Sequence, residues 1–316
     1  LDEGFAASDM PGATVGVWIP GQGEWVATRG VSDTETGEPM NRANQHKIGS
    51  ITKTLTGMIA LQIIGEGRVG LTLDDTIDRW YPDFPEASSI TVRMLMNMSS
   101  GVGVTGEAEI TRVCADPYST VTPEELIAIG AATPRASFAP AGGYAYSTTN
   151  TTLLARILER TTGTDLATLI DERLLAPLGM TRSRFAPDGQ LAAPLTHGYT
   201  DWCNLLGVLP RATDTTDWYL HWAWAAGAMV STIDDLHTWG TALGSGFGLT
   251  PEMLAARVDD TVSVQPLFGQ SDEYGLGVQL LRDPTTDCVT SLYHSGSLPG
   301  YGSWVQSFPT SGSVFA

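Results

Sequence analysis

Lysine is scarce in this chain of 316 residues, which contains only Lys47 and Lys53 beside fifteen arginines. Basic residues are fewer than acidic ones, with 17 Lys and Arg against 35 Asp and Glu, and the formal net charge is −18. A surface this acidic repels phosphate, so we expect neither nucleic acid nor an anionic membrane as a partner. Long apolar runs are also lacking, because no stretch approaches the roughly 18 residues that cross a bilayer.

Cysteine is scarce as well, and three residues are too few for a disulfide scaffold. None of them forms a CxxC pair, and an odd number leaves one unpaired. If the protein is secreted, we predict a disulfide between Cys114 and Cys203, because both lie in expected loops of the helical segment while Cys288 lies in an expected strand. The opening residues LDEGF contain no initiator Met and no signal-peptide pattern, which is typical of a mature or trimmed form.

The usual cofactor and metal motifs are missing. There is no HExxH, no P-loop and no G-x-S-x-G. Gly101, Gly103 and Gly106 match G-x-G-x-x-G, but they follow a helical pattern where a dinucleotide site needs a strand. Five histidines show no metal-ligand spacing: His46, His197, His221, His237 and His294. We therefore expect neither a metal nor a cofactor.

Strand patterns occur at both ends of the chain, and helical patterns lie between them. Residues 13–19 and 24–30 alternate around a Pro- and Gly-bearing turn, which predicts a hairpin. Residues 70–240 are mostly helical in pattern, and strand patterns return from about residue 272. This order predicts an α+β fold, in which an antiparallel sheet is built from both termini and a helical domain is inserted. We place the sheet domain at 1–68 with 222–316, and the helical domain at 69–221. The last segment stops just as a strand begins, so we expect the natural C-terminus to lie further on.

The first candidate for chemistry is the pair Ser50 and Lys53 in the segment HKIGSITKTLTG. The apolar spacing of the following residues predicts a helix that ends near Gly65 and Gly67. Residues i and i+3 share a helix face, so the Lys53 amine can reach the Ser50 hydroxyl. Serine becomes a nucleophile when a neighbour removes its proton, and lysine can do so if burial or nearby charge lowers its pKa. With 22 serines in the chain, the S-x-x-K pattern alone is a weak indication.

Two further segments carry polar groups at the ends of expected elements. In PAGGYAYSTTNTTLL, Tyr146 and Ser147 stand where a Gly-rich loop enters a helix, and the simplest interpretation is an N-cap serine. In SLYHSGSLPGYGSW, His294 ends a strand before Ser295 and Ser297. Backbone N–H groups at such a strand can stabilise a developing oxyanion, although alone the segment is typical of a hairpin turn.

In this order and spacing, the segments SITK, YST and HSG resemble the three motifs of the serine β-lactamase and penicillin-binding-protein family. The similarity is to its class C and D-alanyl-D-alanine carboxypeptidase type, above all to secreted actinomycete carboxypeptidases. Other similar stretches are LDDTIDRWYPDFP, ITVRMLMNMSSGV, APLGM, AWAAGAMVSTIDDL and YGLGVQLL, so the resemblance covers essentially the whole chain. It implies a β-lactamase/transpeptidase-like fold and a location outside the cytoplasm, secreted or in the cell envelope.

The resemblance also implies roles for individual residues. Ser50 would be the acylated nucleophile and Lys53 its base, and Tyr146 would relay protons to the leaving group and to the deacylating water. The backbone N–H groups of Ser50 and Ser297 would form the oxyanion hole. His294 would stand where other members have lysine, offering a positive charge or a hydrogen bond beside Tyr146. Whether Lys53 or Tyr146 takes the first proton stays open.

Three departures from the family pattern affect substrate choice. The third residue of the Tyr motif is Thr148 where an asparagine is usual, and a hydroxyl offers one donor of shorter reach. The close relatives hold a terminal carboxylate with an arginine, but Gln279 stands at that position and Arg282 follows three residues later. The family's last strand and C-terminal helix are absent, and Cys288 resembles a position that pairs with a cysteine near that end.

The expected substrate is a small peptide, ester or β-lactam. Trp222 and Trp224 lie where the family borders its cleft and favour an apolar or aromatic wall, although some of this tryptophan cluster will pack in the core. Substrate contacts are expected from Thr148, Gln279 and Ser295. D-alanyl-D-alanine carboxypeptidase carries most weight, with esterase, D-amino-acid amidase and peptide cyclase close behind. A class C-like β-lactamase and a non-catalytic penicillin or peptidoglycan binder are the remaining alternatives.

Overall fold

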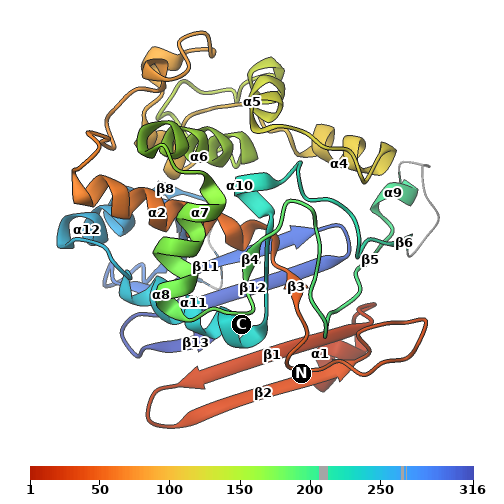
Figure 1. The fold of residues 1–316 in the computed structure, drawn as a ribbon. Helices are drawn as coiled ribbons and strands as arrows, with labels where there is room; N and C mark the ends of the chain where they lie inside the picture. Colours follow the sequence, from red (N-terminus) through yellow and green to blue (C-terminus); the bar gives the residue numbers. More distant parts are fainter. Residues whose placement is uncertain (206–212, 265–266, 268) are drawn as a thin grey trace.

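The two ends of the chain together form an antiparallel sheet (Figure 1). The structure is a computed structural model that describes residues 1–205, 213–264, 267 and 269–316. The strands of this sheet are arranged in the order β2-β1-β13-β12-β11-β10-β9-β8. Their bounds are β1 Gly12–Ile19, β2 Gly23–Gly30, β8 Val262–Ser263, β9 Ser271–Tyr274, β10 Gln279–Arg282, β11 Val289–Leu298, β12 Tyr301–Phe308 and β13 Ser313–Phe315. Strands from opposite ends of the sequence meet where β1 pairs with β13 (Figure 1). The expected sheet is therefore present.

The predicted N-terminal hairpin is confirmed. β1 and β2 pair antiparallel in continuous register from Gly12 opposite Gly30 to Ile19 opposite Gly23. The turn between them places Gly21 at φ 76° and Gly23 at φ 109°, conformations that residues with a Cβ rarely adopt. The sequence Pro-Gly-Gln-Gly thus supplies the backbone freedom that the turn needs.

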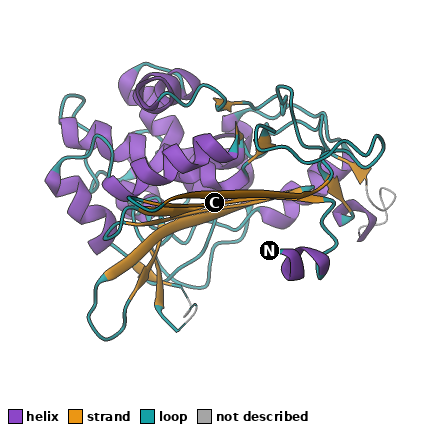
Figure 2. Ribbon diagram, turned by 90° about the horizontal axis from the view of Figure 1, so that it is seen from below, coloured by secondary structure: helices purple, strands orange, loops and turns teal. Residues whose placement is uncertain are grey.

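Most helices lie on one face of the sheet, and the short N-terminal helix α1 lies on the other (Figure 2). The helices are α1 Asp2–Ala6, α2 Thr52–Glu66, α3 Val92–Met96, α4 Gly106–Ala115, α5 Pro123–Ala132, α6 Thr148–Thr162, α7 Leu166–Ile170, α8 Ala176–Leu178, α9 Trp202–Leu205, α10 Trp224–Gly227, α11 Ile233–Ser245 and α12 Pro251–Asp259. The 3-10 turns are Gly49–Ile51, Ile77–Arg79 and Ala87–Ser89, and a π-helical turn spans Asp171–Leu175.

Helix α2 is central, because it packs against α6, α10 and α12 and follows directly on the turn that holds Ser50. Every residue from Thr52 to Ile63 is buried, so the helix is apolar on several sides instead of having one apolar stripe. It continues through Gly65 to Glu66, and Gly67 caps it at φ 64°. Of the two glycines expected near the end of this helix, Gly67 is the one that ends it.

Local capping explains why α5 begins at Pro123. The Thr122 hydroxyl accepts a hydrogen bond from the backbone N–H of Glu125, while the Glu125 carboxylate accepts one from the Thr122 N–H. This capping box satisfies two N–H groups that have no partner inside a helix, and proline is well tolerated at the first helical position.

Two small sheets connect the layers. One has the order β3-β7-β4, with β3 His46–Lys47, β7 Met229–Ser231 and β4 Arg184–Phe185, and the other pairs β5 Tyr199–Thr200 with β6 Thr213–Asp214. β4 belongs to the segment 69–221, and it pairs with a strand of the segment 222–316. The domain boundaries derived from the sequence stay a prediction.

Candidate active site

Ser50 lies on the 3-10 turn Gly49–Ile51, and Lys53 lies in the first turn of α2. The Lys53 Nζ donates to Ser50 Oγ over 2.9 Å and to the backbone carbonyl of Ala226, at the end of α10, over 3.0 Å. These two acceptors fix the amine against the hydroxyl. The i, i+3 contact that the sequence suggested is therefore made.

Burial controls the protonation of Lys53, whose side chain is 2% exposed. Loss of water disfavours the charged form and lowers the pKa of the amine to about 7, although the negative charge of Glu109 acts in the opposite direction. Near neutral pH, a substantial fraction of Lys53 is therefore uncharged. In that form it can accept a proton from Ser50.

Tyr146 closes the other side of this pair. Its ring centre lies 4.8 Å from Lys53 Nζ, and its phenol shares a hydrogen bond with Ser50. Burial raises the pKa of the phenol, and the hydrogen bond with Ser50 only partly offsets this. Tyr146 thus stays protonated at neutral pH, which makes it a proton donor in the resting site and leaves Lys53 as the group able to accept the first proton.

His294 lies on β11 with its ring centre 6.2 Å from that of Tyr146, and it is 1% exposed. The Tyr274 hydroxyl lies 3.0 Å from Nε2, and the Ser295 carbonyl oxygen lies 2.6 Å from Nδ1. Because a carbonyl only accepts, Nδ1 carries the proton and Nε2 accepts from Tyr274. Burial, with the nearby Lys53 amine, lowers the pKa of His294 to about 3. Of the two roles considered from the sequence, a neutral hydrogen-bonding group fits and a positive charge does not.

Strand β11 approaches the Ser50 turn very closely. Gly49 has φ 51°, and a Cβ on it would lie only 2.9 Å from the backbone nitrogen of Ser297. A Cβ on Gly296 would lie 2.0 Å from the Ile48 carbonyl oxygen. Two glycines therefore allow the backbones of residues 48–50 and 296–297 to meet. This brings the backbone beside Ser50 close to the backbone nitrogen of Ser297, as an oxyanion hole formed by the N–H groups of these two residues would require.

Thr148 opens α6 and bonds to a residue that the sequence analysis missed. Its hydroxyl donates to Glu109 Oε1 over 2.5 Å, and the Thr105 hydroxyl donates to the same oxygen over 2.5 Å. Glu109 is 7% exposed and lies on α4. Its charge acts on both Lys53 and Tyr146. Ser147 takes the N-cap position, but its hydroxyl donates to the Gly103 carbonyl and does not cap the helix. A buried carboxylate therefore lies near enough to act electrostatically on Lys53 and Tyr146.

Gln279 lies on β10 opposite Tyr293, the neighbour of His294. Its side-chain amide donates to the Tyr293 hydroxyl over 3.3 Å, and Tyr293 in turn donates to Asp272 over 2.7 Å. Arg282 is engaged elsewhere, because its guanidinium donates to the Val258 and Asp287 carbonyls and pairs with Glu273. The end of the site where the family pattern has a carboxylate-binding arginine thus carries an amide that is linked to an acid.

The remaining sequence candidates differ in exposure. Ser295 is exposed on β11, whereas Trp222 is half-buried and its indole N–H has no hydrogen-bond partner among the described residues. Trp224 is 8% exposed, takes φ 30° and packs edge-on against Phe185. Little of the Trp224 ring is accessible, so Trp222 offers the more available aromatic surface.

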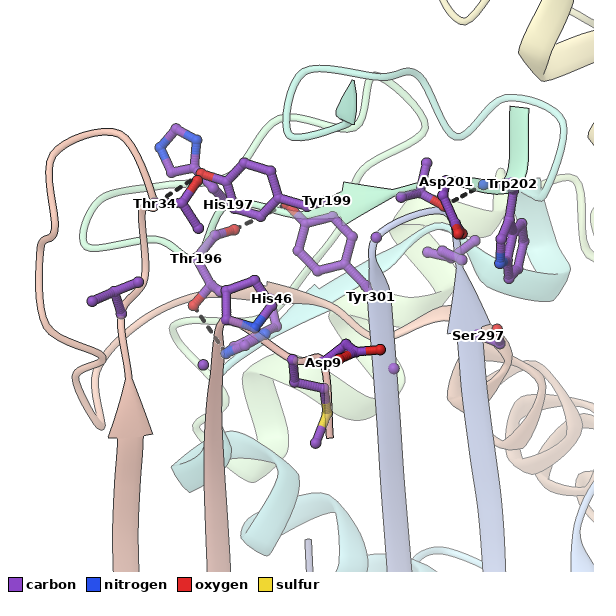
Figure 3. Close-up of a pocket in the computed structure, with 18 residues that line it drawn as sticks. Asp9, Thr34, His46, Thr196, His197, Tyr199, Asp201, Trp202, Ser297 and Tyr301 are labelled. Carbon is purple, nitrogen blue, oxygen red and sulfur yellow. Dashed lines mark hydrogen bonds between the residues drawn. The ribbon is translucent and has the colours of Figure 1, made fainter. Parts of the chain in front are cut away.

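A cavity of about 760 Å³ opens beside Ser297 (Figure 3). Its walls include Tyr199, Trp202 and Tyr301, together with the carboxylates Asp9 and Asp201, and no Lys or Arg is part of its lining. Ser50, Lys53 and Tyr146 are not among its lining residues. The cavity is therefore a neighbouring chamber with acidic and aromatic walls, and Ser297 is the residue that it shares with the candidate site.

The cysteines behave as expected. Cys114 and Cys203 form a disulfide, and Cys288 is free and exposed. The elements expected for the cysteines were wrong. Cys114 and Cys203 lie in the helices α4 and α9, not in loops, and Cys288 precedes the strand β11. Within the described residues, no helix has the length and apolarity to cross a membrane, and no three His, Cys, Asp or Glu gather as metal ligands.

Comparison with known proteins agrees with this geometry. The family model described as Beta-lactamase matches residues 1–316. A D-aminopeptidase of Brucella anthropi is 30% identical over 299 residues, covering 92% of this chain and 52% of the relative. Penicillin-binding protein 4* of Bacillus subtilis is 26% identical, covering 86% of this chain and 60% of its own length. The chain thus spans roughly half of the curated relatives that it matches.

Solved structures show the same fold. A D-stereospecific amidohydrolase from Streptomyces sp. superposes with a TM-score of 0.85 and 27% identity, covering 99% of this chain and 90% of that one. The D-amino acid amidase from Ochrobactrum anthropi SV3, complexed with D-phenylalanine, gives 0.83 and 26%, covering 100% and 88%. The expected β-lactamase/transpeptidase-like fold is confirmed. The chain belongs to the Beta-lactamase family.

Proposed function

We propose that this chain hydrolyses amides and esters of short substrates that carry a protonated amino group next to the scissile carbonyl. The acyl group is transferred to Ser50 and then to water. The observation that carries this proposal is Glu109, a buried carboxylate held beside the site by Thr105 and Thr148. Among the described residues, only its Oε1 has hydrogen-bond partners, so Oε2 can accept from an ammonium group.

The catalytic cycle follows from the protonation states of the site. Uncharged Lys53 accepts the Ser50 proton as Oγ attacks the carbonyl carbon, and the N–H groups of Ser50 and Ser297 stabilise the oxyanion. Tyr146 donates its proton to the departing amine or alcohol and is reprotonated by Lys53. A water molecule then attacks the acyl ester on Ser50, and Tyr146 and Lys53 remove the proton of this water. The proton passes to Ser50 Oγ as the acid product leaves, which restores the free hydroxyl. His294 and Tyr274 hold the Tyr146 side of the site without adding charge.

The names of the relatives support an amino-acid derivative as the substrate. They include a D-aminopeptidase, a D-amino acid amidase and an esterase, Esterase EstB of Burkholderia gladioli. The D-alanyl-D-alanine carboxypeptidase that the sequence favoured needs a cation for a terminal carboxylate. Gln279 is neutral and linked to Asp272, and Arg282 is engaged elsewhere, so that activity becomes the second candidate.

The test compares D-alanine amide, whose amino group is a charged ammonium, with N-acetyl-D-alanine amide, in which an acetyl group makes the same nitrogen neutral. We expect a kcat/KM at least about tenfold higher for the free amine, because charge-assisted hydrogen bonds contribute about 1.5–3 kcal/mol. At a pH above the acidic limb, where Lys53 is uncharged in both proteins, Glu109→Gln should remove most of this preference while leaving turnover of the acetylated substrate intact. Equal rates for the two amides in the unmodified protein would overturn the assignment.

We also propose that the protein works outside the cytoplasm. The disulfide Cys114–Cys203 supports this, because such bonds persist in oxidising compartments and are rare in the cytosol. Fractionation of the producing cells, followed by activity measurement in each fraction, tests the location. Activity confined to the cytosol would contradict it.

A further inference from the structure

The wall of the site beyond His294 is built almost entirely of tyrosines. Tyr144 lies 5.9 Å from Tyr274, and Tyr146 lies 6.1 Å from Tyr274, between ring centres. Asp272 lies two residues before Tyr274 on the same strand, β9, and its negative charge raises the pKa of the Tyr144 phenol. The wall therefore reaches continuously from the reacting atoms to Asp272.

Asp272 is the only negative group that a hydrogen-bond chain links to this wall among the described residues. It is 8% exposed and accepts from the Tyr293 hydroxyl, which itself accepts from the Gln279 amide. The ring of Tyr293 stacks on Trp304 at 4.8 Å, which fixes the direction of its hydroxyl. The amide of Gln279 has a second N–H, so it can still donate to a neutral oxygen of a substrate.

The charged groups near Asp272 do not neutralise its negative charge. Glu273, its neighbour on β9, adds negative charge, and Arg282 on β10 is paired with Glu273 at 3.4 Å. Tyr144 and Tyr293 are neutral, because burial raises the pKa of both phenols. Burial also raises the pKa of Asp272, whereas the hydrogen bond from Tyr293 favours its ionised form. The field at this end of the site is therefore negative.

We propose that Asp272, Tyr293 and Gln279 form a specificity filter that rejects leaving groups with a free carboxylate and accepts neutral or cationic ones. The filter deepens the proposed function and rests on it, since it concerns the departing half of the same substrate. Tyr146 delivers its proton at this end of the site, and the leaving group must lie against the tyrosine wall when it does so. A carboxylate there meets the field of Asp272 and finds no cation to replace its water.

The experiment uses three substrates with the same D-alanyl acyl group and a free amine: D-alanyl-D-alanine, its C-terminal amide, and D-alanine p-nitroanilide as a neutral reference. We expect the unmodified protein to prefer the dipeptide amide over the dipeptide acid by at least about tenfold in kcat/KM, the effect of two like unit charges about 12 Å apart at an effective dielectric of about 20. The difference should lie in KM, because repulsion acts before the chemical step.

Asp272→Asn should bring the two dipeptides within about threefold of each other, with both rates expressed relative to that of the p-nitroanilide in the same variant. Asp83→Asn is the matched control, since it removes the same charge from an exposed site and should leave the ratio as it is. Tyr293→Phe removes the hydrogen bond that favours the ionised form of Asp272, and should lower the ratio as well. Tyr293→Phe also tests the filter if Asp272→Asn fails to fold.

Other outcomes would overturn the filter. If the unmodified protein hydrolyses the p-nitroanilide but treats the acid and the amide of the dipeptide alike, the filter is wrong while the proposed function stands. If the preference survives both Asp272→Asn and Tyr293→Phe, another group sets it and the assignment to these residues fails. If the p-nitroanilide is not hydrolysed at all, the proposed function falls and the filter falls with it.

Discussion

The reactivity of single residues in this site depends on burial. The same loss of water lowers the pKa of Lys53 to about 7, raises that of Tyr146 and lowers that of His294 to about 3. One group thereby becomes a base, one stays an acid, and one carries no charge. The three side chains acquire distinct protonation states because each lies in a low-dielectric environment with a specific partner.

The pH dependence of kcat/KM reports the state of Lys53. Because only the uncharged amine accepts the Ser50 proton, activity should rise with pH through an apparent pKa near 7, the value to which burial lowers that of Lys53. The charge of Glu109 raises this pKa, so Glu109→Gln should move the acidic limb to lower pH. The measurement uses an acetyl ester without an amino group, so that the amine-binding role of Glu109 does not enter. A limb that stays in place or moves to higher pH would contradict the coupling.

Sequence reasoning found some of these residues and missed others for a physical reason. Ser50 and Lys53 are neighbours on one helical turn, so their spacing alone shows that they can touch. Tyr146 and His294 came from the resemblance to known motifs. Glu109 was missed, because it meets the site through a contact between α4 and Thr148 of a distant segment, and no local pattern records such a meeting.

At the scale of elements, the site depends on how closely β11 can approach the turn before α2. Gly49 and Gly296 have no side chains, and this permits the contact between the two backbones. Long elements were predictable, since hairpin alternation and helical spacing extend over many residues. The two-residue strands β3, β4, β5 and β6 were not foreseen, because a pattern with period two needs more residues to be seen.

Replacing Gly49 with alanine tests this contact. The new Cβ would lie 2.9 Å from the Ser297 nitrogen and must push the two N–H groups apart. We expect kcat for a neutral ester to fall by about 10²- to 10³-fold, the effect of losing one oxyanion donor.

The matched control is Gly67→Ala, which has a similar left-handed φ of 64° but nothing within 4 Å of the added Cβ. Both variants carry the cost of a left-handed residue, about 1–2 kcal/mol of stability, which thermal unfolding measures. Only Gly49→Ala should lose kcat. Equal kcat values for the two variants would show that the close approach is not needed for catalysis.

At the scale of the whole molecule, two distant segments are joined by the disulfide Cys114–Cys203, which spans 89 residues. It ties α4, the helix that carries Glu109, to α9. The order of strand, helix and strand patterns along the chain was enough to predict the α+β architecture. Which cysteines pair was predicted from the segment they share, although the elements assigned to them were wrong.

Removing this bond should destabilise the protein and disturb amine recognition. Cys114→Ala combined with Cys203→Ala should lower the free energy of unfolding by about 4 kcal/mol, since the closed loop is long. Because α4 is then less restrained, kcat/KM for D-alanine amide should fall more than that for a neutral ester. Cys288→Ala, at the exposed free cysteine, is the control and should change neither quantity. A double variant as stable as the control would contradict a structural role for the bond.

The formation of a covalent bond at Ser50 is the central claim, and trapping it is the most direct test. The protein is mixed with a fluorescent penicillin or with an excess of D-alanine p-nitrophenyl ester, quenched in acid within seconds, and analysed by intact mass and peptide mapping. We expect one acyl group per chain on the peptide that contains Ser50. Ser50→Ala should carry none, keep its fold, and lose turnover by at least about a thousandfold. An acyl group on another residue, or undiminished turnover by Ser50→Ala, would contradict the account.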